Sequence, residues 1–301
     1  ARPVRTVERK GRSLRLGGFF SAATRDDLER VADRLDCYGL AAIPAPGGYH
    51  EWPDAECSAY GEEASRLDIV IGECGYWANL LVRDGETRAT RINDIRARLA
   101  KAEVLGCGSV VSLVGSAHPS GGAAAPDAYN YSDACKDEFR EIVLRILDGL
   151  SLDRTKYIIE PWHNTFFYKP ADIAEFIDRV DHPAFGLHLD LMNMISQETF
   201  YDTTGLARET FALLSDHVAS VHLKDAQFDA SHHWVKWDEV DIGDGVMDYE
   251  AYLTGLAELD EDMPCYCEHM SEEREYALNF ARLHHLAKGA GVAFRRRAAV
   301  A

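Results

Sequence analysis

The run Tyr157-Ile158-Ile159-Glu160-Pro161-Trp162 is a short apolar segment that closes on a carboxylate, and three later runs repeat this pattern. They are Phe185-Gly186-Leu187-His188-Leu189-Asp190, Val218-Ala219-Ser220-Val221-His222-Leu223-Lys224-Asp225 and Cys265-Tyr266-Cys267-Glu268-His269-Met270. If the four runs are adjacent parallel strands, Glu160, Asp190, His222 and Glu268 meet at one end of the sheet. Three carboxylates and one imidazole form an open site for one divalent cation; we expect Mn²⁺, with Mg²⁺ or Co²⁺ as alternatives.

Strand-like runs alternate with amphipathic segments eight times along the 301 residues. The runs cover 15–20, 38–43, 67–73, 107–113, 156–160, 185–190, 218–224 and 264–268, and the helical segments cover 24–36, 55–66, 87–104, 133–150, 170–180, 202–216, 248–259 and 271–289. This alternation predicts an α/β fold with a parallel sheet, and eight units predict a closed (β/α)8 TIM barrel that ends in a helix. We expect a single domain over 1–301, with tails at 1–13 and 292–301.

Helix starts and long loops support this organisation. Ser132 and Ser271 precede helical segments as expected N-caps, and Pro170 fits a first helical turn. Two long loops, 114–130 and 225–245, follow predicted strands, so both should lie on the rim of a barrel that carries the active site. No glycine-rich nucleotide-binding motif follows the first strand, which disfavours a nucleotide-binding fold.

Composition narrows the class of protein. Hydrophobic residues make up 47% and charged residues 27%, the balance of a soluble globular enzyme. No apolar run is long enough for a membrane span, and no signal-peptide pattern opens the chain, so we expect a cytoplasmic protein. The net charge of −18 repels phosphate backbones and disfavours nucleic-acid binding. Seven scattered cysteines without a CxxC motif indicate reduced, mostly buried thiols.

The side-chain alternation of each run is consistent with an inward-facing site. If the four candidate ligands point inward, their outward neighbours are all apolar, as helix-facing positions should be: Leu187, Leu189, Val221, Leu223, Cys265 and Cys267. A single strand-end charge commonly faces water. Four at successive strand ends instead indicate a shared cation, because buried carboxylates need a counter-charge.

Further residues near these strand ends are candidates for substrate binding. Glu73 points inward near the mouth by the same alternation. His188 lies one layer below Asp190 and is either a substrate contact or a buried partner of the ligands. Asn193 either donates to a substrate hydroxyl or caps a loop. Asp225 orients either a substrate or the histidine, and Trp162 either offers a face for a sugar ring or anchors its loop.

Two more side chains on the rim are ambiguous. His163, three residues after Glu160, is either a catalytic acid or base or an exposed loop histidine. Lys224 is interpreted as pointing outward into the packing.

The pair His232-His233 is a weak metal signal, because adjacent residues seldom converge on one ion. Trp77, Trp234 and Trp237 fall on expected rim loops.

The four segments, with Ile242-Gly243-Asp244-Gly245-Val246-Met247-Asp248-Tyr249 and the closing Glu268-His269, resemble the xylose-isomerase-like superfamily of sugar isomerases and epimerases. The resemblance covers nearly the whole chain. It implies a TIM barrel whose metal ligands are Glu160, Asp190, His222 and Glu268, with the two glutamates as an acid/base pair. It also implies a sugar or glycoside as the substrate.

One departure from the family pattern and one further resemblance keep the reaction open. Ketose 3-epimerases usually carry a histidine three residues after the aspartate, where this chain has Asn193. The stretch from Trp237 to Leu253 resembles a branch that includes the catalytic subunit of C-glycoside deglycosidases, lyases that act on 3-keto glycosides by elimination. We therefore expect an isomerase or epimerase, with the lyase as the alternative and a non-catalytic binding subunit as a third reading. The expected assembly is a homo-oligomer, or a hetero-oligomer with a small subunit for a deglycosidase.

Overall fold

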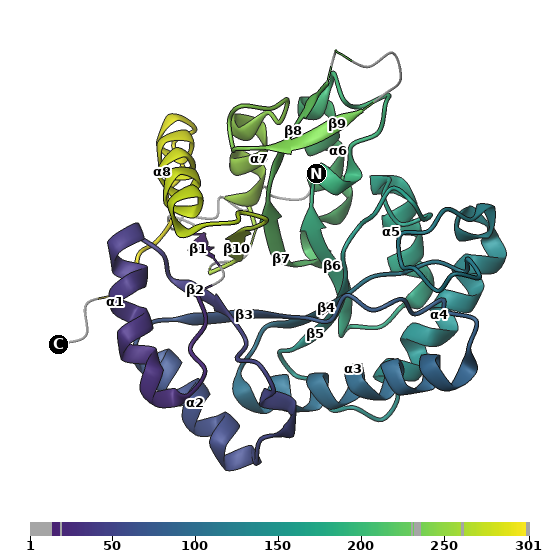
Figure 1. The fold of residues 1–301 in the computed structure, drawn as a ribbon, viewed down its shortest axis with the longest axis horizontal. Coiled ribbons are helices and arrows are strands. Elements are labelled where there is room, and N and C mark those ends of the chain that lie inside the picture. The colour runs from purple at the N-terminus through teal and green to yellow at the C-terminus, as the bar shows by residue number, and fades with distance from the viewer. Residues whose placement is uncertain (1–13, 19, 230, 232–235, 260–261, 299–301) are drawn as a thin grey trace, which may run out of the picture.

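Eight parallel strands close into a barrel in the computed structural model, which describes residues 14–298 except 19, 230, 232–235 and 260–261 (Figure 1). The order around the barrel is β1-β10-β7-β6-β5-β4-β3-β2. The strands are β1 (Arg15–Gly17), β2 (Ala42–Pro44), β3 (Val70–Gly75), β4 (Ser109–Ser112), β5 (Lys156–Ile159), β6 (Phe185–Asp190), β7 (Val218–Leu223) and β10 (Pro264–Cys267). The predicted α/β class and the closed (β/α)8 barrel are confirmed.

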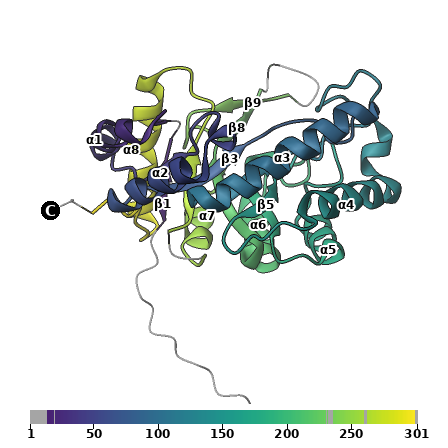
Figure 2. The same ribbon diagram turned by 90° about the horizontal axis from the view of Figure 1, so that it is seen from below.

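Helices surround this barrel as an outer layer (Figure 2). They are α1 (Leu28–Tyr38), α2 (Asp54–Arg66), α3 (Gly85–Leu105), α4 (Asp133–Leu147), α5 (Pro170–Val180), α6 (Thr203–Leu214), α7 (Tyr249–Leu256) and α8 (Glu273–Gly289). Successive helices from α2 to α8 contact one another, and α8 contacts α1. None of the helices in the described part of the chain has the length and apolar character of a membrane span.

The apolar core lies between the strands and this helix layer. The expected outward-facing residues of β6, β7 and β10, such as Leu187 and Val221, are fully buried there. Ser132 caps α4 as predicted, because its Oγ accepts the N–H of Cys135 at 3.2 Å. The expected cap at Ser271 is wrong by one residue, since Glu272 caps α8. All seven cysteines are free thiols, and Cys37 alone among them is exposed.

The expected loop 225–245 contains a hairpin. Its strands, β8 (Asp225–Phe228) and β9 (Trp237–Val240), pair antiparallel at the rim of the barrel, beyond β6 and β7 (Figure 1). Trp237 stacks on Phe200, with ring centroids 5.3 Å apart, so it anchors the hairpin to the rim. The alternation in these four-residue strands is too short to stand out in the sequence. His232, His233 and Trp234 lie outside the described residues.

The expected C-terminal tail is wrong for its described part, 292–298. Phe294 is buried and bridges Leu14, whose carbonyl accepts the N–H of Arg295 at 2.8 Å. Arg297 donates to Asp36 at 2.9 Å. One buried aromatic and two arginines, Arg295 paired with Asp262 and Arg297 with Asp36, therefore dock this segment on the barrel. Residues 1–13 and 299–301 lie outside the described residues.

Glu103, near the end of α3, makes a pH-dependent contribution to stability. Its carboxylate accepts the N–H of Thr155 at 2.9 Å and that of Arg154 at 3.2 Å. Burial raises the pKa of Glu103, but these backbone donors outweigh burial and hold it below its usual value of 4.5. A carboxyl whose folded-state pKa is lowered stabilises the fold above its unfolded pKa and loses that effect as the pH falls.

We therefore expect Glu103→Gln to lower the free energy of unfolding by about 1–2 kcal/mol at pH 7. The difference from wild type should shrink as the pH falls below about 4.5, where the unfolded carboxyl takes up a proton. Urea unfolding of both proteins at pH 7 and pH 3.5 measures this. A difference of the same size at both values would show that the charge of Glu103 contributes nothing.

Candidate metal centre

The four predicted ligands converge at the C-terminal ends of four strands. Asp190 ends β6 and pairs directly with His222 on β7, while Glu160 and Glu268 each follow the last residue of a strand. One ligand atom from each residue lies within 4.8 Å of those of the other three, and all four side chains are buried. His222 Nδ1 faces Glu268 Oε1 at 2.7 Å. A compact, buried set of three carboxylates and one imidazole fits a hard divalent cation.

Lys224 lies inside this quartet, so the outward position expected for it is wrong. Its Nζ is 2.8 Å from Asp190 Oδ2 and 3.7 Å from Glu160 Oε1, and it also contacts Glu268 Oε1. Burial lowers the pKa of Lys224, but these three carboxylates raise it well above its usual value, so the amine is cationic. The signal was present in the sequence, because Lys224 is two residues after His222 and so faces the same side.

The pKa values of the two glutamates diverge. Burial, supported by the charge of Asp190, raises the pKa of Glu160 to about 7 against the lowering effect of His222. Burial also raises the pKa of Glu268, but His222 and Lys224 outweigh it and bring the value to about 2. Two carboxyl groups with different proton affinities beside one cavity are typical of an acid/base site.

A second buried cluster lies beneath the quartet. His222 Nε2 is 3.1 Å from Glu73 Oε1, and Ser220 Oγ donates to Glu73 Oε2 at 3.1 Å. His188 Nδ1 is 2.5 Å from Ser220 Oγ. Glu73 and His188 are fully buried and do not line the cavity above, so the structure does not place them for a substrate contact; His188 packs instead against His222, as the alternative reading of it expected. Strand β3 runs on to Gly75, which puts Glu73 one layer below the mouth.

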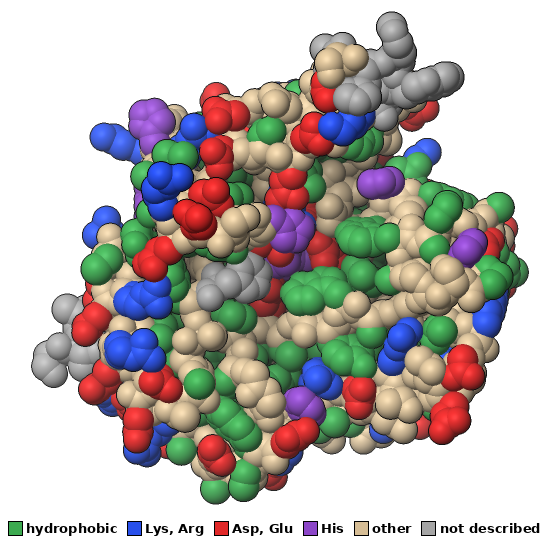
Figure 3. Space-filling model, viewed as in Figure 1, with side chains coloured by type: hydrophobic (Ala, Val, Ile, Leu, Met, Phe, Trp, Pro, Cys, Tyr) green, Lys and Arg blue, Asp and Glu red, His purple; other side chains and the backbone are tan. Residues whose placement is uncertain are grey.

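A cavity of about 850 Å³ opens above the quartet, in the hollow at the centre of the face in Figure 3, where acidic and histidine side chains gather. Glu160, Lys224 and Glu268 form its floor. Its other lining residues are Trp77, Leu113, Ala123, Ala124, Trp162, His163, Asn164, Met192, Asn193, Glu239, His269 and Tyr276. Trp162, His163 and Asn193 therefore lie on the wall of the cavity in which a substrate would bind. Their roles stay predictions.

Two side chains of the wall hold Glu160 in place. Asn193 Nδ2 donates to Glu160 Oε1 at 2.9 Å, and the indole N–H of Trp77 donates to Glu160 Oε2. Any side chain at Gly75 would collide with the Trp77 ring, since a Cβ there would be 1.8 Å from it. The sequence placed Trp77 on the rim but gave no sign that it contacts the first ligand.

His269 and Glu239 are further wall residues that sequence reasoning missed. His269 adopts a left-handed backbone with φ of 65°, uncommon for a residue with a side chain. Its Nδ1 is 2.9 Å from Glu239 Oε2, and this contact raises the pKa of His269. His163 is also exposed, but the burial of part of its ring lowers its pKa, so the ring is neutral at pH 7.

Asp225 does not reach the cavity. Its carboxylate accepts the backbone N–H groups of Gly243, Gly245 and Met247 at 2.9–3.1 Å, as well as that of Ala226. Three of these donors belong to the loop that follows the hairpin and one to β8, so the carboxylate is occupied and is not placed for the substrate contact expected for Asp225. Gly243 has φ of 87°, a conformation that favours glycine in this tight turn.

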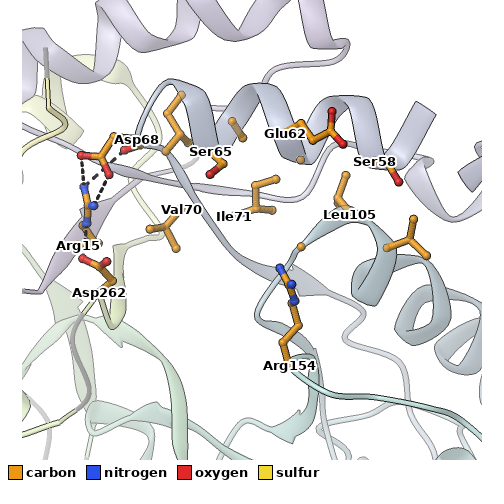
Figure 4. A pocket seen from close by; sticks show the side chains of 15 residues that line it. Arg15, Ser58, Glu62, Ser65, Asp68, Val70, Ile71, Leu105, Arg154 and Asp262 are labelled. Carbon is orange, nitrogen blue, oxygen red and sulfur yellow. Dashed lines mark hydrogen bonds and ion pairs between the residues drawn. The ribbon is translucent and has the colours of Figure 1, made fainter. Parts of the chain in front are cut away.

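The opposite end of the barrel holds a cavity of about 640 Å³ that lacks such chemistry (Figure 4). Its buried cation, Arg15, is already paired with Asp68 at 2.5 Å and with Asp262 at 2.7 Å. These groups lie at the N-terminal ends of the strands, the face of a TIM barrel that serves stability. We therefore place the functional site at the quartet alone.

The chain matches a known protein family and is similar in fold to several solved structures. The family model of xylose isomerase-like TIM barrels matches residues 18–287. A xylose isomerase domain protein from Planctomyces limnophilus is 20% identical, with a TM-score of 0.65 over 94% of this chain and 99% of that one. A xylose isomerase-like TIM barrel protein from Mycobacterium smegmatis, in complex with magnesium, is 17% identical, with a TM-score of 0.63 over 89% and 90%.

Several of the similar structures are named for a specific activity, among them sugar epimerases and an endonuclease IV. The 3-keto-D-glucoside 4-epimerase from E. coli is 13% identical, with a TM-score of 0.63 over 92% of this chain and 100% of that one. No curated protein sequence matches. Identities this low show a shared fold alone, whereas the family model spans most of the chain. The protein therefore belongs to the family of xylose isomerase-like TIM barrels.

Proposed function

We propose that this protein is a divalent-metal-dependent isomerase or epimerase of sugars or keto-glycosides. The observation that carries the proposal is the buried quartet of Glu160, Asp190, His222 and Glu268 at the floor of the large cavity. Family membership and the epimerase among the similar structures support the same class. We propose Mn²⁺ as the ion, held by these four residues. When bound, a divalent cation supplies a Lewis acid that polarises a carbonyl group.

Glu160 and Glu268 are the proposed pair that moves the proton. They reach into the cavity from β5 and β10, which are separated by β6 and β7, so they approach a bound molecule from different sides. Glu160 lines the cavity, so its carboxylate can take up a proton from a bound molecule and return it. Glu268 is ionised before the reaction, as the proton acceptor of the pair must be, and its charge also pairs with Lys224.

The remaining wall residues orient the substrate. Asn193 and Trp77 both donate to Glu160, which fixes the direction of its carboxylate. Trp162 offers an apolar face to a sugar ring, and His163, neutral and exposed at the cavity wall, can exchange a proton with a hydroxyl group. Positioning of this kind converts a bimolecular proton transfer into one within a single complex.

A lyase acting by elimination is the second candidate, favoured by the size and character of the cavity. Its volume of about 850 Å³ exceeds the needs of a single sugar, and Leu113, Met192 and Tyr276 add an apolar wall. Such a wall suits a glycoside with an apolar substituent rather than a free, fully hydroxylated ketose. In this version, His163 is the proposed base and a C-glycoside of a 3-keto sugar is the proposed substrate.

Hydrogen exchange in D₂O distinguishes the candidates. The metal-loaded protein is incubated with ketoses, inosose-like ketones and 3-keto glycosides, and proton NMR spectra are recorded after protein and metal are removed. Deuterium next to a carbonyl, with a new epimer or isomer, supports the isomerase. Release of the substituent supports the lyase. Absence of any exchange would contradict both and leave a non-catalytic binding subunit.

The same reaction tests the metal requirement. We expect chelation with EDTA to abolish exchange and added Mn²⁺ to restore it, because removing the cation leaves no Lewis acid for the carbonyl. Mg²⁺ and Co²⁺ are added in parallel to rank the ions. Full activity in chelated protein shown by elemental analysis to be metal-free would contradict the proposal.

The assembly is a separate part of the proposal. We expect a homo-oligomer for an isomerase, and a hetero-oligomer with a small subunit for a deglycosidase. Light scattering on the purified chain, alone and after co-expression with a partner, measures its mass. A monomer that is fully active would contradict both expectations.

A further inference from the structure

Glu73 and His222 form a buried contact that the proposed reaction does not use directly. Glu73 is 1% exposed and touches no part of the cavity, yet its Oε1 is 3.1 Å from His222 Nε2. The other ring nitrogen, Nδ1, faces the quartet, 2.7 Å from Glu268 Oε1 and 3.9 Å from Glu160 Oε1. The two nitrogens of one imidazole thus lie between two carboxylate sites.

The neighbouring groups indicate that Glu73 is the acceptor in its contact with His222. Ser220 has one hydroxyl proton, which it donates to Glu73 Oε2 at 3.1 Å. His188 Nδ1, 2.5 Å from the same hydroxyl, must then carry its own proton and donate to Ser220. His188 therefore donates to Ser220, and Ser220 donates to Glu73. Glu73 is the acceptor at the end of this series of hydrogen bonds.

We propose that Glu73 is a positioning residue, which accepts the Nε2–H of His222 and so leaves Nδ1 as the atom that binds the metal ion. The inference rests on the metal centre of the proposed function. An ionised acceptor on the second nitrogen fixes the tautomer and the orientation of a ligand histidine and makes the ligating nitrogen more basic. The close, nearly perpendicular packing of the His188 and His222 rings, with centroids 4.0 Å apart, limits rotation of the ligand.

Metal binding by two variants tests this role. Glu73→Gln keeps an acceptor oxygen but loses the charge, whereas Glu73→Leu removes the acceptor at similar volume. We expect Mn²⁺ affinity, measured by isothermal titration calorimetry, to fall about tenfold in Glu73→Gln and about 100-fold in Glu73→Leu. The visible spectrum of bound Co²⁺ should shift in both. At saturating Mn²⁺, the kcat of Glu73→Gln should recover most of the wild-type value.

Glu103→Gln is the matched control, since it also removes a mostly buried carboxylate that accepts hydrogen bonds but lies away from the quartet. We expect it to lower stability and leave Mn²⁺ affinity unchanged. If Glu73→Leu does not fold, the nearly isosteric Glu73→Gln still carries the test. Mn²⁺ affinity and Co²⁺ spectra equal to those of the wild type would overturn the positioning role.

The outcomes separate this inference from the proposed function. A wild type that binds Mn²⁺ and loses affinity in both variants, but exchanges hydrogen in no sugar or glycoside, supports Glu73 and contradicts the isomerase. Variants that bind Mn²⁺ as the wild type does, in a protein that exchanges substrate hydrogen, overturn Glu73 alone. A wild type that binds no divalent cation overturns both.

Discussion

Glu268→Gln should reduce turnover by about 10³-fold or more, while the protein keeps its fold. The neutral amide loses both a negative charge next to the metal centre and a group that can exchange a proton, and general acid–base catalysis alone contributes about 10²–10⁴-fold. Glu268 is also the carboxylate that contacts Lys224 and lies 2.7 Å from His222 Nδ1. Rates are measured by hydrogen exchange at saturating Mn²⁺, so that weaker metal binding does not account for the loss.

Glu239→Gln is the matched control for this variant. Glu239 lines the same cavity and is hydrogen-bonded to His269, but it belongs to the hairpin and not to the quartet. We expect less than a tenfold effect from it. Circular dichroism and thermal unfolding show whether each variant is folded. Activity of folded Glu268→Gln close to that of the wild type would remove Glu268 from the mechanism.

Lys224→Met should destabilise the metal-free protein by about 3–5 kcal/mol, the usual cost of removing one partner from a buried ion pair. The ammonium group is the counter-charge of Asp190, Glu160 and Glu268. With His222 neutral, as metal ligation requires, three carboxylates and one ammonium leave two negative charges, which a divalent cation balances. We therefore expect Mn²⁺ to restore most of the lost stability and to bind the variant more tightly than the wild type.

Urea unfolding with EDTA and with Mn²⁺ measures both effects. Lys136→Met is the control, because Lys136 is also buried and paired, with Glu175 at 2.8 Å, but lies on α4 outside the quartet. Its loss of stability should be the same with and without Mn²⁺. A metal-free Lys224→Met protein as stable as the wild type would show that the lysine does not neutralise the carboxylates.

The sequence was sufficient for the fold and for the members of the quartet, because both depend on local patterns. Alternation of apolar residues identifies strands, and a polar residue at each strand end marks the rim of a parallel barrel. The pairing of Asp190 with His222 agrees with this reasoning. The position of Lys224 could also have been predicted by alternation, because Lys224 is two residues after His222 and residues two apart face the same side.

The depth of a side chain along the barrel axis could not be predicted from the alternation of residues. Glu73 points inward as its alternation requires, but β3 continues to Gly75 and places it beneath the ligands instead of at the mouth. Asp225 follows a strand end like the ligands, yet the turn at Gly243 takes up its carboxylate. Hydrogen bonds between residues far apart in the chain decide both outcomes, and no short stretch of sequence contains them.

The sequence by itself thus determined the closed barrel, the inward direction of its side chains and the identity of the four candidate ligands. Only the tertiary structure decided which neighbours those ligands have: Lys224 among the carboxylates, Glu73 behind His222, and Trp77 and Asn193 on Glu160. The physical reason is that alternation fixes the face on which a side chain lies, whereas the stagger between strands and the path of the rim loops fix its height and its partners.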